Sequence, residues 1–365
     1  MARCTNLNRR NARAQVMKKI ELRSDTFTLP TDEMINAIVE AHRNRRLGDD
    51  VAGEDEVVNE LQEKAARILG KEKALLVTSG TQGNLISMFS QTKRGDEVVM
   101  ERMSHSFMFE GGAMASLGGL FPKPVEGVRG YILPEALENA ISSDDPHYAR
   151  TAMVNIENTH NYAGGVVVTP EKTKALVDVA REHDLKVHVD GARLFNAAVA
   201  LGIPASNLVK YADSVQICLS KGLSAPVGSL VAGTEEFIHE AHRMRKKMGG
   251  GMRQAGIIAA PGIVALEKMV SRLKDDHDNA RLLYEKISKI PELGVDEPDT
   301  NILFVTFEKL GIDALQFSNE LKEKGVLVYG EYGTRTRFVL NRMVSREDTL
   351  YVADAIEDVV QRFRN

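Results

Sequence analysis

Two charged residues follow apolar runs at places where an α/β sheet binds ligands. Lys221 follows the apolar run 214–219 with only Ser220 between them. An amine that is desolvated at the end of a buried strand has the depressed pKa that Schiff-base chemistry needs, although a lysine there can also extend into solvent. Asp190 follows residues 185–189, so its carboxylate would face the crevice at the carboxyl ends of parallel strands. Its alternative role is to cap a helix beginning near Arg193.

A turn of small residues supplies a third element. Thr78-Ser79-Gly80-Thr81 lies between a short apolar run and an amphipathic segment. Such a turn leaves backbone N–H groups unpaired in front of a helix dipole, which suits a phosphate. The same turn is also a common connection between a strand and a helix.

Together these features meet the requirements of pyridoxal 5'-phosphate (PLP). The turn would hold the phosphate, Asp190 would keep the pyridine nitrogen protonated, and Lys221 would bind the aldehyde carbon. Each feature alone has an ordinary structural explanation, but their conjunction favours a PLP site.

The chain also resembles the low-specificity L-threonine aldolases, which are fold-type I PLP enzymes of the β-eliminating lyase group. The resemblance runs over residues 22–344. The segments that carry it are Leu22-Arg23-Ser24-Asp25-Thr26, Gly48-Asp49-Asp50-Val51-Ala52-Gly53-Glu54-Asp55, Ser79-Gly80-Thr81, His105 with Glu110-Gly111-Gly112, Glu157-Asn158-Thr159-His160-Asn161, the run from His188 to Ala197, Cys218-Leu219-Ser220-Lys221-Gly222-Leu223, and Gly249-Gly250-Gly251-Met252-Arg253-Gln254.

This resemblance implies a role for each site residue. Lys221 would form the Schiff base, Asp190 would pair with the pyridine nitrogen, His105 would stack on the ring, and His160 would meet the substrate hydroxyl. The implied cofactor contacts are Ser79, Gly80, Thr81, His105, Asp190, Arg193 and Lys221, and the implied substrate-carboxylate contacts are Ser24, Arg193 and Arg337. A guanidinium fork suits a carboxylate because it binds both oxygens. No metal site is expected.

Two positions depart from the pattern of the family. The family usually has an aromatic residue, most often tyrosine, where this chain has Ala52, and a histidine where it has Asn341. Neither position bears on PLP binding, but both put the preference for threonine in doubt. A smaller residue at position 52 would enlarge the pocket.

The resemblance therefore implies retro-aldol cleavage of L-threonine, L-allo-threonine or a related β-hydroxy-α-amino acid to glycine and an aldehyde. His160, or a water that it orients, would take the hydroxyl proton. The alternative on the same fold is an amino acid racemase or a β-eliminating lyase. An alternative of another class is a non-enzymatic protein that keeps the fold for binding.

These residues need a mostly parallel α/β sheet to bring them together. Short apolar runs alternate with longer amphipathic segments, which is typical of βαβ units. We expect helices at 31–46, 55–69, 81–92, 170–183 and 234–248, with strands near 73–77, 96–100, 151–156, 185–189, 213–219 and 227–232.

After about residue 270 the pattern becomes α+β. It predicts a charged helix over 271–290, a turn over 291–300, a strand at 302–306, another helix and a final strand at 336–340. We therefore expect a tail at 1–20, an N-terminal arm with a large PLP-binding domain at 21–269, and a small domain at 270–365.

Composition narrows the remaining choices. The 365 residues carry 47 basic and 51 acidic side chains, so no basic field attracts nucleic acid. Cys4 and Cys218 cannot build a disulfide framework, which favours a reducing cytoplasm. The most apolar stretch, residues 256–266, is interrupted by Pro261 and is too short to span a membrane.

Three charged segments have ordinary explanations. The basic segment at residues 1–19 faintly resembles a transit peptide but fits a simple tail. We expect residues 242–247 to form a solvated helix face and residues 275–278 to be exposed to solvent. The family further implies a homodimer or homotetramer in which the arm and residues 49–54 reach a neighbouring subunit.

Overall fold

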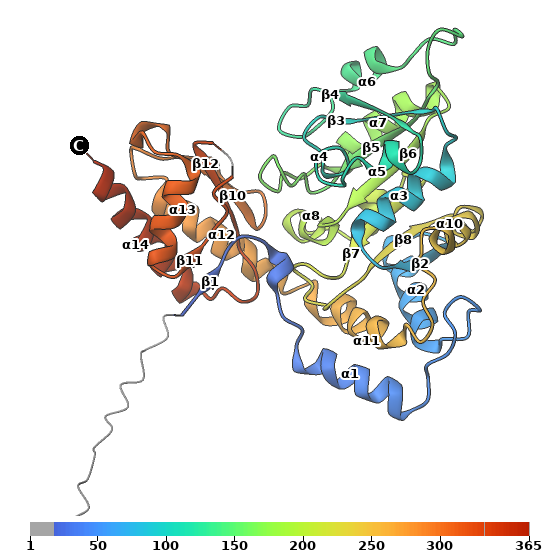
Figure 1. Ribbon diagram of the computed structural model, residues 1–365, viewed down its shortest axis with the longest axis horizontal. Helices are drawn as coiled ribbons and strands as arrows, with labels where there is room; N and C mark the ends of the chain where they lie inside the picture. The colour runs from blue at the N-terminus through green and yellow to red at the C-terminus, as the bar shows by residue number, and fades with distance from the viewer. Residues whose placement is uncertain (1–17, 332, 365) are drawn as a thin grey trace, which may run out of the picture.

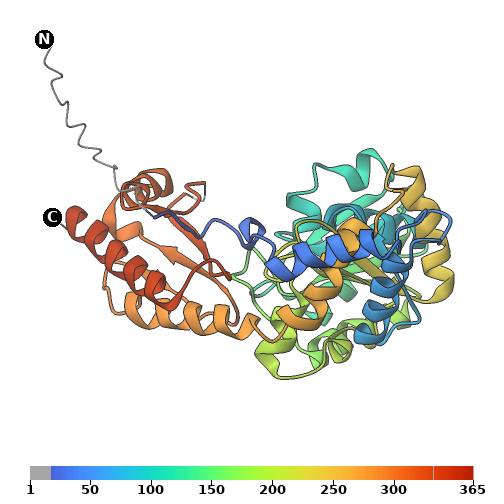
Figure 2. The ribbon, with the colours of Figure 1, turned by 90° about the horizontal axis from the view of Figure 1, so that it is seen from below.

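The computed structural model describes residues 18–331 and 333–364, and these form two lobes (Figure 1). Seen from below, the lobes lie side by side and are joined by the N-terminal arm and by the start of α12, Leu273–Ile287 (Figure 2). The predicted tail lies almost wholly outside the described residues, as does Cys4.

A seven-stranded sheet forms the centre of the large lobe. Its strand order is β2-β8-β7-β6-β5-β3-β4, and only β8 runs antiparallel to its neighbours. The strands are β2 (Lys73–Val77), β3 (Glu97–Glu101), β4 (Phe121–Val125), β5 (Thr151–Glu157), β6 (Lys186–Gly191), β7 (Ser214–Cys218) and β8 (Ser229–Gly233).

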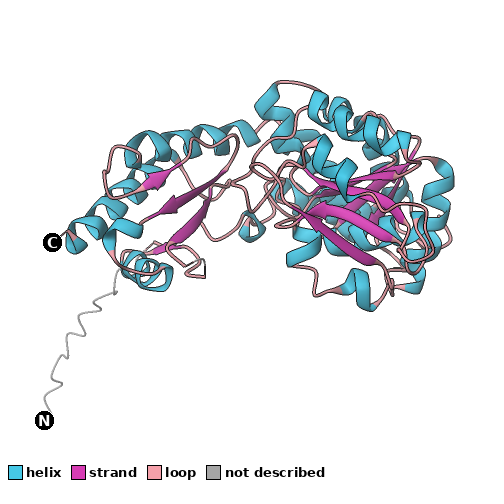
Figure 3. Ribbon diagram, turned by 90° about the horizontal axis from the view of Figure 1, so that it is seen from above, coloured by secondary structure: helices cyan, strands magenta, loops and turns pink. Residues whose placement is uncertain are grey.

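Helices cover both faces of this sheet, as Figure 3 shows. Alternate residues of a strand point to opposite faces. On β3, Val99 joins the main core, whereas Val98 and Met100 pack in a separate cluster with Leu85 and Met88 of α3, Gly80–Gln91. Burial of both faces explains why the strands of this sheet are continuous apolar runs.

The other helices of the large lobe connect and surround these strands. The longer ones are α1 (Asp32–Arg43), α2 (Glu56–Leu69), α7 (Pro170–Glu182), α8 (Leu194–Leu201), α10 (Glu235–Lys247) and α11 (Gly256–Val264). The shorter ones are η1 (Asp25–Phe27), α4 (His105–Met108), α5 (Ala113–Ser116), α6 (Pro134–Ala140), α9 (Ala205–Val209) and the π-helical turn η2 (Ala265–Met269).

The small lobe has its own core around an antiparallel sheet. Its strands lie in the order β12 (Arg335–Val339), β10 (Ile302–Thr306) and β9 (Gly294–Val295), and the helices α12, α13 (Ala314–Glu323) and α14 (Arg346–Phe363) pack against them, with a 3-10 turn η3 at Glu308–Leu310. The arm strand β1 (Ile20–Glu21) pairs with β11 (Val326–Leu327). Ile20 and Leu22 are therefore buried in the small-lobe core, although we assigned the arm to the large domain.

Among the elements that the sequence prediction did not contain, three are informative. Strand β4 was not predicted because Pro122 and Pro124 cannot donate to a ladder, but β4 is the edge strand, where proline is tolerated. We expected β12 to be the last element, yet the 18-residue helix α14 follows it and begins with a capping box at Ser345. Helix α11 continues through Pro261 and passes into η2, so proline does not end it.

No helix among the described residues is long and apolar enough to cross a membrane.

One buried carboxylate fixes the loop before α2. Asp55 accepts hydrogen bonds from the backbone N–H groups of Val57 and Val58 through Oδ1 and from those of Gly48 and Gly256 through Oδ2. It thereby caps α2 and joins the loop at 48–55 to α11.

We expect Asp55→Ala to lower the free energy of unfolding by about 3 to 5 kcal/mol, because four buried donors lose a charged acceptor. The free energy of unfolding of Asp55→Asn should lie between those of the wild type and Asp55→Ala, since asparagine keeps one acceptor oxygen. Urea unfolding checks this, with the exposed neighbour Glu56→Ala as the control, for which we expect under about 1 kcal/mol. Equal losses for the two alanine variants would contradict this role.

Candidate active site

The predicted site residues meet at the carboxyl edge of the central sheet. Asp190 lies near the end of β6, Lys221 follows β7, and His105 and His160 follow β3 and β5. β2 runs in the same direction as β7 because β8 is antiparallel to both, so the turn before α3 reaches the same edge. This is the edge where open α/β sheets bind ligands.

The turn at residues 78–81 forms an open helix N-terminus. Ser79 caps α3 by accepting the N–H of Gln82. A Cβ atom added to Gly80 would lie 2.9 Å from the Cys218 Sγ atom, so the backbone approaches β7 more closely than a larger residue permits. Thr81 is half-buried in the first turn. The free N–H groups can receive an anion.

Asp190 is buried and receives two hydrogen bonds. The Asn84 side-chain amide donates to Oδ2 at 2.8 Å, and the N–H of Ala192 donates to Oδ1 at 3.1 Å. Asn84 also donates to Oε1 of Glu110 at 2.8 Å. Because both carboxylates need donors, the orientation of this amide follows from its partners.

Behind Asn84, a chain of buried polar groups runs into the sheet. His188 contacts Asn84 Oδ1 through Nε2 at 3.2 Å and Ser214 Oγ through Nδ1 at 2.8 Å, and Gln91 donates to Ser214. An amide oxygen only accepts, so Nε2 of His188 carries the hydrogen. Burial lowers the pKa of His188 to about 4, which keeps the ring neutral. These hydrogen bonds orient the Asn84 amide so that its N–H group donates to Asp190.

Glu110 pairs with the imidazole of His105. The His105 Nδ1 atom lies 3.2 Å from Glu110 Oε1, and ligand atoms of His105, Glu110 and Asp190 all lie within 4.8 Å of one another. Burial, together with the charge of Asp190, raises the pKa of Glu110. The pKa of His105 is also raised: burial opposes protonation, but the Glu110 hydrogen bond and the charge of Asp190 outweigh it.

Arg193 is bound by the N-terminal arm. Its Nε and Nη2 atoms bind both oxygens of Asp25 at 2.8 and 2.7 Å in a fully buried pair. Burial alone would raise the pKa of Asp25, but the charges of Arg193, Lys221 and Arg337 lower it. Thr28 donates to the Lys221 carbonyl at 2.6 Å, so the arm also supports the lysine loop.

Asn161 joins the two arginines that we predicted as carboxylate contacts. Its Oδ1 atom accepts from Arg337 Nη1 at 2.6 Å and from Arg193 Nη1 at 3.3 Å. Ser24, the residue before Asp25, is buried as well. Its hydroxyl accepts hydrogen bonds from the N–H and hydroxyl groups of Thr26. The structure therefore brings Arg193 and Arg337 together from different lobes.

His160 is 1% exposed, and both of its ring nitrogens have protein partners. Nε2 lies 2.9 Å from Oε2 of Glu101, and Nδ1 accepts the N–H of Ala163 at 3.2 Å. Burial opposes protonation of the ring, but the carboxylates of Glu157, Glu101 and Asp190 raise the pKa of His160. Its contact with a substrate hydroxyl stays a prediction.

The two positions that depart from the family have different surroundings. Ala52 is exposed in the loop between α1 and α2. Asn341 is buried, and its amide donates to the carbonyls of Glu21 and Val339. Asn341 thus ties the arm to the end of β12.

Two expectations about charged segments hold for the exposed residues Arg243, Lys246, Lys247, Asp275 and Asp278 but fail at one buried residue each. Arg245 lies in the segment that we expected to be solvated, yet it is fully buried, 2.9 Å from Asp50 and bonded to the Leu76 carbonyl at 2.7 Å. Within residues 275–278, Asp276 is buried against Arg272, and burial raises its pKa to about 6. Asp50 and the Leu76 carbonyl, both distant in the chain, permit the burial of Arg245, whereas Asp276 is paired with Arg272 four residues earlier.

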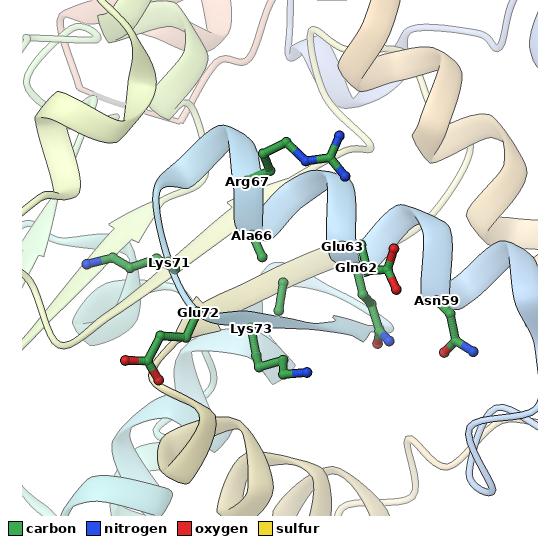
Figure 4. Close-up of a pocket in the computed structure, with 9 residues that line it drawn as sticks. Asn59, Gln62, Glu63, Ala66, Arg67, Lys71, Glu72 and Lys73 are labelled. Atoms are coloured by element: carbon green, nitrogen blue, oxygen red, sulfur yellow. The ribbon is translucent and has the colours of Figure 1, made fainter.

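A cavity of about 440 Å³ lies apart from this edge, between α2 and β2 (Figure 4). Figure 4 shows that charged and amide side chains surround it, and none of them is a predicted site residue. Its lining residues are Asn59, Gln62, Glu63, Ala66, Arg67, Lys71, Glu72, Lys73 and Ala74.

Sequence reasoning missed five residues that hold the site together. They are Asp25, Asn84, Glu110, Glu157 and Asn161. Glu157 accepts the N–H groups of His105 and Asn161 at 2.6 and 2.8 Å and so fixes the two loops relative to each other. Four of the five, all except Asn84, lie in the segments that resemble the family, so the resemblance could have identified them. Their hydrogen-bond partners are visible only in the fold.

The residues at this edge fit PLP. The Gly80 turn is a close backbone cradle for a phosphate, the buried Asp190 carboxylate is supplied with donors, and the charge of Lys221 lowers the pKa of Asp25 and opposes the rise in the pKa of His105. A parallel sheet with this arrangement at its carboxyl edge defines a fold-type I PLP-dependent enzyme.

Comparison with known proteins gives the family: the chain belongs to the β-eliminating lyases, whose model matches residues 21–309. It is 43% identical to the low specificity L-threonine aldolase of Escherichia coli K12, covering 92% of this chain and 97% of that protein. It is 40% identical to low-specificity L-threonine aldolase 1 of Arabidopsis thaliana, covering 94% and 97%.

Two further similarities are more distant. The alanine racemase TOXG of Cochliobolus carbonum is 32% identical, with 93% of this chain and 86% of that protein covered. The solved structure of Leishmania major threonine aldolase superposes with a TM-score of 0.80 at 17% identity, covering 93% of this chain and 99% of the other. The structural match confirms the predicted fold class.

We expect Glu110→Gln to stabilise the cofactor-free protein more at about pH 8 than at about pH 4. The pKa of Glu110 is raised in the folded state, so its stabilising effect is present below its ordinary pKa and is lost as pH rises through the raised value. Glutamine cannot ionise and avoids this loss. Thermal unfolding at both pH values checks the prediction, with the exposed Glu182→Gln as control. A difference between wild type and Glu110→Gln that does not change with pH would contradict it.

Proposed function

We propose that this protein is a PLP-dependent aldehyde-lyase that cleaves L-threonine, L-allo-threonine or a related β-hydroxy-α-amino acid to glycine and an aldehyde. Two relatives, which are 40% and 43% identical to this chain, are named low-specificity L-threonine aldolases. The observation that carries the proposal is the meeting of Lys221, Asp190 and the Gly80 turn at one sheet edge.

The cofactor would be held by residues at the ends of four strands, β2, β3, β6 and β7. Lys221 would bind its aldehyde carbon, Asp190 would face the pyridine nitrogen, and His105 would pack on the ring. Ser79, Gly80 and Thr81 would hold the phosphate, and Arg193 would complete the contacts. When bound, PLP accepts the electron pair that is released as the Cα–Cβ bond breaks.

The substrate carboxylate would lie between Ser24, Arg193 and Arg337. Arg193 already binds Asp25 through two nitrogens, so its Nη1 atom, whose only hydrogen bond among the described residues is the 3.3 Å contact with Asn161, is the group that would turn to a substrate. Arg337 enters from the small lobe beside the same amide oxygen. Two cations and a hydroxyl would fix the orientation of an amino acid.

His160, or a water that it orients, would take the hydroxyl proton. Its Nδ1 and Nε2 atoms are engaged with Ala163 and Glu101, so either route requires one of these bonds to be exchanged. The bond from the Ala163 N–H to Nδ1, at 3.2 Å, is the longer of the two.

Racemisation is the second candidate because a relative over nearly the whole chain is named an alanine racemase. The two activities differ in which bond at Cα is broken. Release of an aldehyde marks cleavage, whereas a D-amino acid without aldehyde marks racemisation.

We further infer that the protein acts as a homodimer or homotetramer in the cytoplasm. The exposed loop that carries Ala52 is supported by the buried pair of Asp50 and Arg245, which suits a segment that must keep its shape against a neighbouring subunit.

We expect the PLP-loaded protein to release equal amounts of glycine and aldehyde from L-threonine or another β-hydroxy amino acid. Lys221→Ala should lower kcat by more than about 10³-fold because the amine is lost. Borohydride reduction should fix the cofactor on the peptide that contains Lys221.

The control is Lys174→Ala, which removes an exposed lysine from α7. A reduced label on another lysine, or an active Lys221→Ala variant, would overturn the assignment. Formation of a D-amino acid without aldehyde would support the racemase.

A further inference from the structure

Strand β12 directs two arginines toward the large lobe. Arg335 and Arg337 are two residues apart, so their side chains share one face of the strand. Arg337 bonds Asn161, and the guanidinium carbon of Arg335 lies 4.7 Å from the ring centroid of the next residue, Tyr162. Consecutive residues of one loop thus meet alternate residues of one strand.

Arg335 also contacts an aromatic ring of its own lobe. Its guanidinium carbon lies 4.5 Å from the centroid of Phe304, which stands opposite Arg337 in the β10 and β12 ladder. The Tyr162 and Phe304 centroids are 5.9 Å apart. Within residues 18–331 and 333–364, Arg335 forms no ion pair with a carboxylate, so the two rings are its main contacts.

The loop that carries Asn161 and Tyr162 is fitted to the small lobe. Thr300 donates to the Gly165 carbonyl at 2.8 Å, and Asp299 accepts the N–H of Val167 at 3.0 Å. Gly165 has φ +70°, and a Cβ atom there would lie 2.5 Å from Thr300 Oγ1. Only glycine fits at position 165 because the backbone lies so close to Thr300. The loop is therefore packed in one position against residues 299–304.

We propose that Arg335 is a positioning residue that fastens this loop to β12 and thereby holds Arg337, Asn161 and Arg193 in the arrangement that receives the substrate carboxylate. The contacts of Arg335 with Tyr162 and Phe304 are named the clasp. The inference rests on the proposed function for the role of Arg337, but the clasp itself rests on the distances between Arg335 and the two rings.

The clasp predicts an effect on binding more than on turnover. Loss of a cation–π contact lets the loop and β12 separate, which weakens the carboxylate site without touching Lys221 or Asp190. Arg335→Met keeps the apolar stem but removes the charge, and Tyr162→Leu removes the ring. Each should raise KM for L-threonine roughly 5- to 30-fold, with kcat changed less than about threefold.

Binding of glycine, measured through the absorbance of the bound cofactor, supplies a readout that needs no turnover. Its Kd should rise by the same factor as KM. The double variant Arg335→Met with Tyr162→Leu should lose less than the sum of the two single losses, because both substitutions remove the contact between Arg335 and Tyr162. Tyr162→Phe should behave like wild type, and Arg335→Lys should recover part of the loss since it keeps the charge but not the plane.

The matched control is Arg281→Met, an exposed arginine of α12 in the same lobe. Unchanged KM and Kd in Arg335→Met and Tyr162→Leu, or losses that add in the double variant, would overturn the clasp. The clasp would also be overturned if Arg335→Lys had the KM and Kd of wild type and if high salt removed the difference between Arg335→Met and wild type. That pattern indicates electrostatic steering of the substrate.

Two further outcomes are distinguishable. If Arg335→Met does not fold, Tyr162→Leu and Tyr162→Phe still decide the matter. If the wild type cleaves no β-hydroxy amino acid, the proposed function fails, whereas the glycine titrations of the same variants continue to test the clasp.

Discussion

Asp190 is buried at the carboxyl edge of the central sheet, where an ionised carboxylate is costly unless donors surround it. The structure meets this cost with Asn84, whose amide is oriented by neutral His188 and, through it, by Ser214 and Gln91. Because Asn84 and Gln91 both belong to α3, the same helix that opens at the Gly80 turn also fixes the carboxylate. The Gly80 turn and the Asp190 carboxylate are therefore held at a fixed distance from each other.

Much of the large lobe was predictable because its strands are buried on both faces. Continuous apolar runs identified β2, β3, β5, β6, β7 and β8, and small residues marked the turn before α3. The edge strand β4 was missed because its prolines argue against a strand in the interior of a sheet. Helix α14 was not predicted, although Val352, Ile356, Val359 and Val360 recur at helical spacing and are buried.

The partners of the site residues were not predictable, because they come from segments far apart in the chain. Lys221 and Asp190 were found from their places after strands. That Asp25 occupies two nitrogens of Arg193, or that Asn161 joins Arg193 to Arg337, depends on the docking of the arm and the small lobe. Buried Arg245 failed the sequence prediction for the same reason, since Asp50 and the Leu76 carbonyl are far from it in the chain. The partner of buried Asp276 is Arg272, four residues earlier, so this pair follows a local helical spacing that the sequence prediction did not use.

The central claim is that Asp190 keeps the pyridine nitrogen protonated, and the chemical shift of that nitrogen tests it most directly. The protein would be loaded with PLP carrying ¹⁵N in the ring, and spectra of wild type and Asp190→Asn would be compared near neutral pH. The account predicts a protonated nitrogen in wild type and an unprotonated one in Asp190→Asn. An unprotonated nitrogen in wild type, or equal protonation in both proteins, would contradict it.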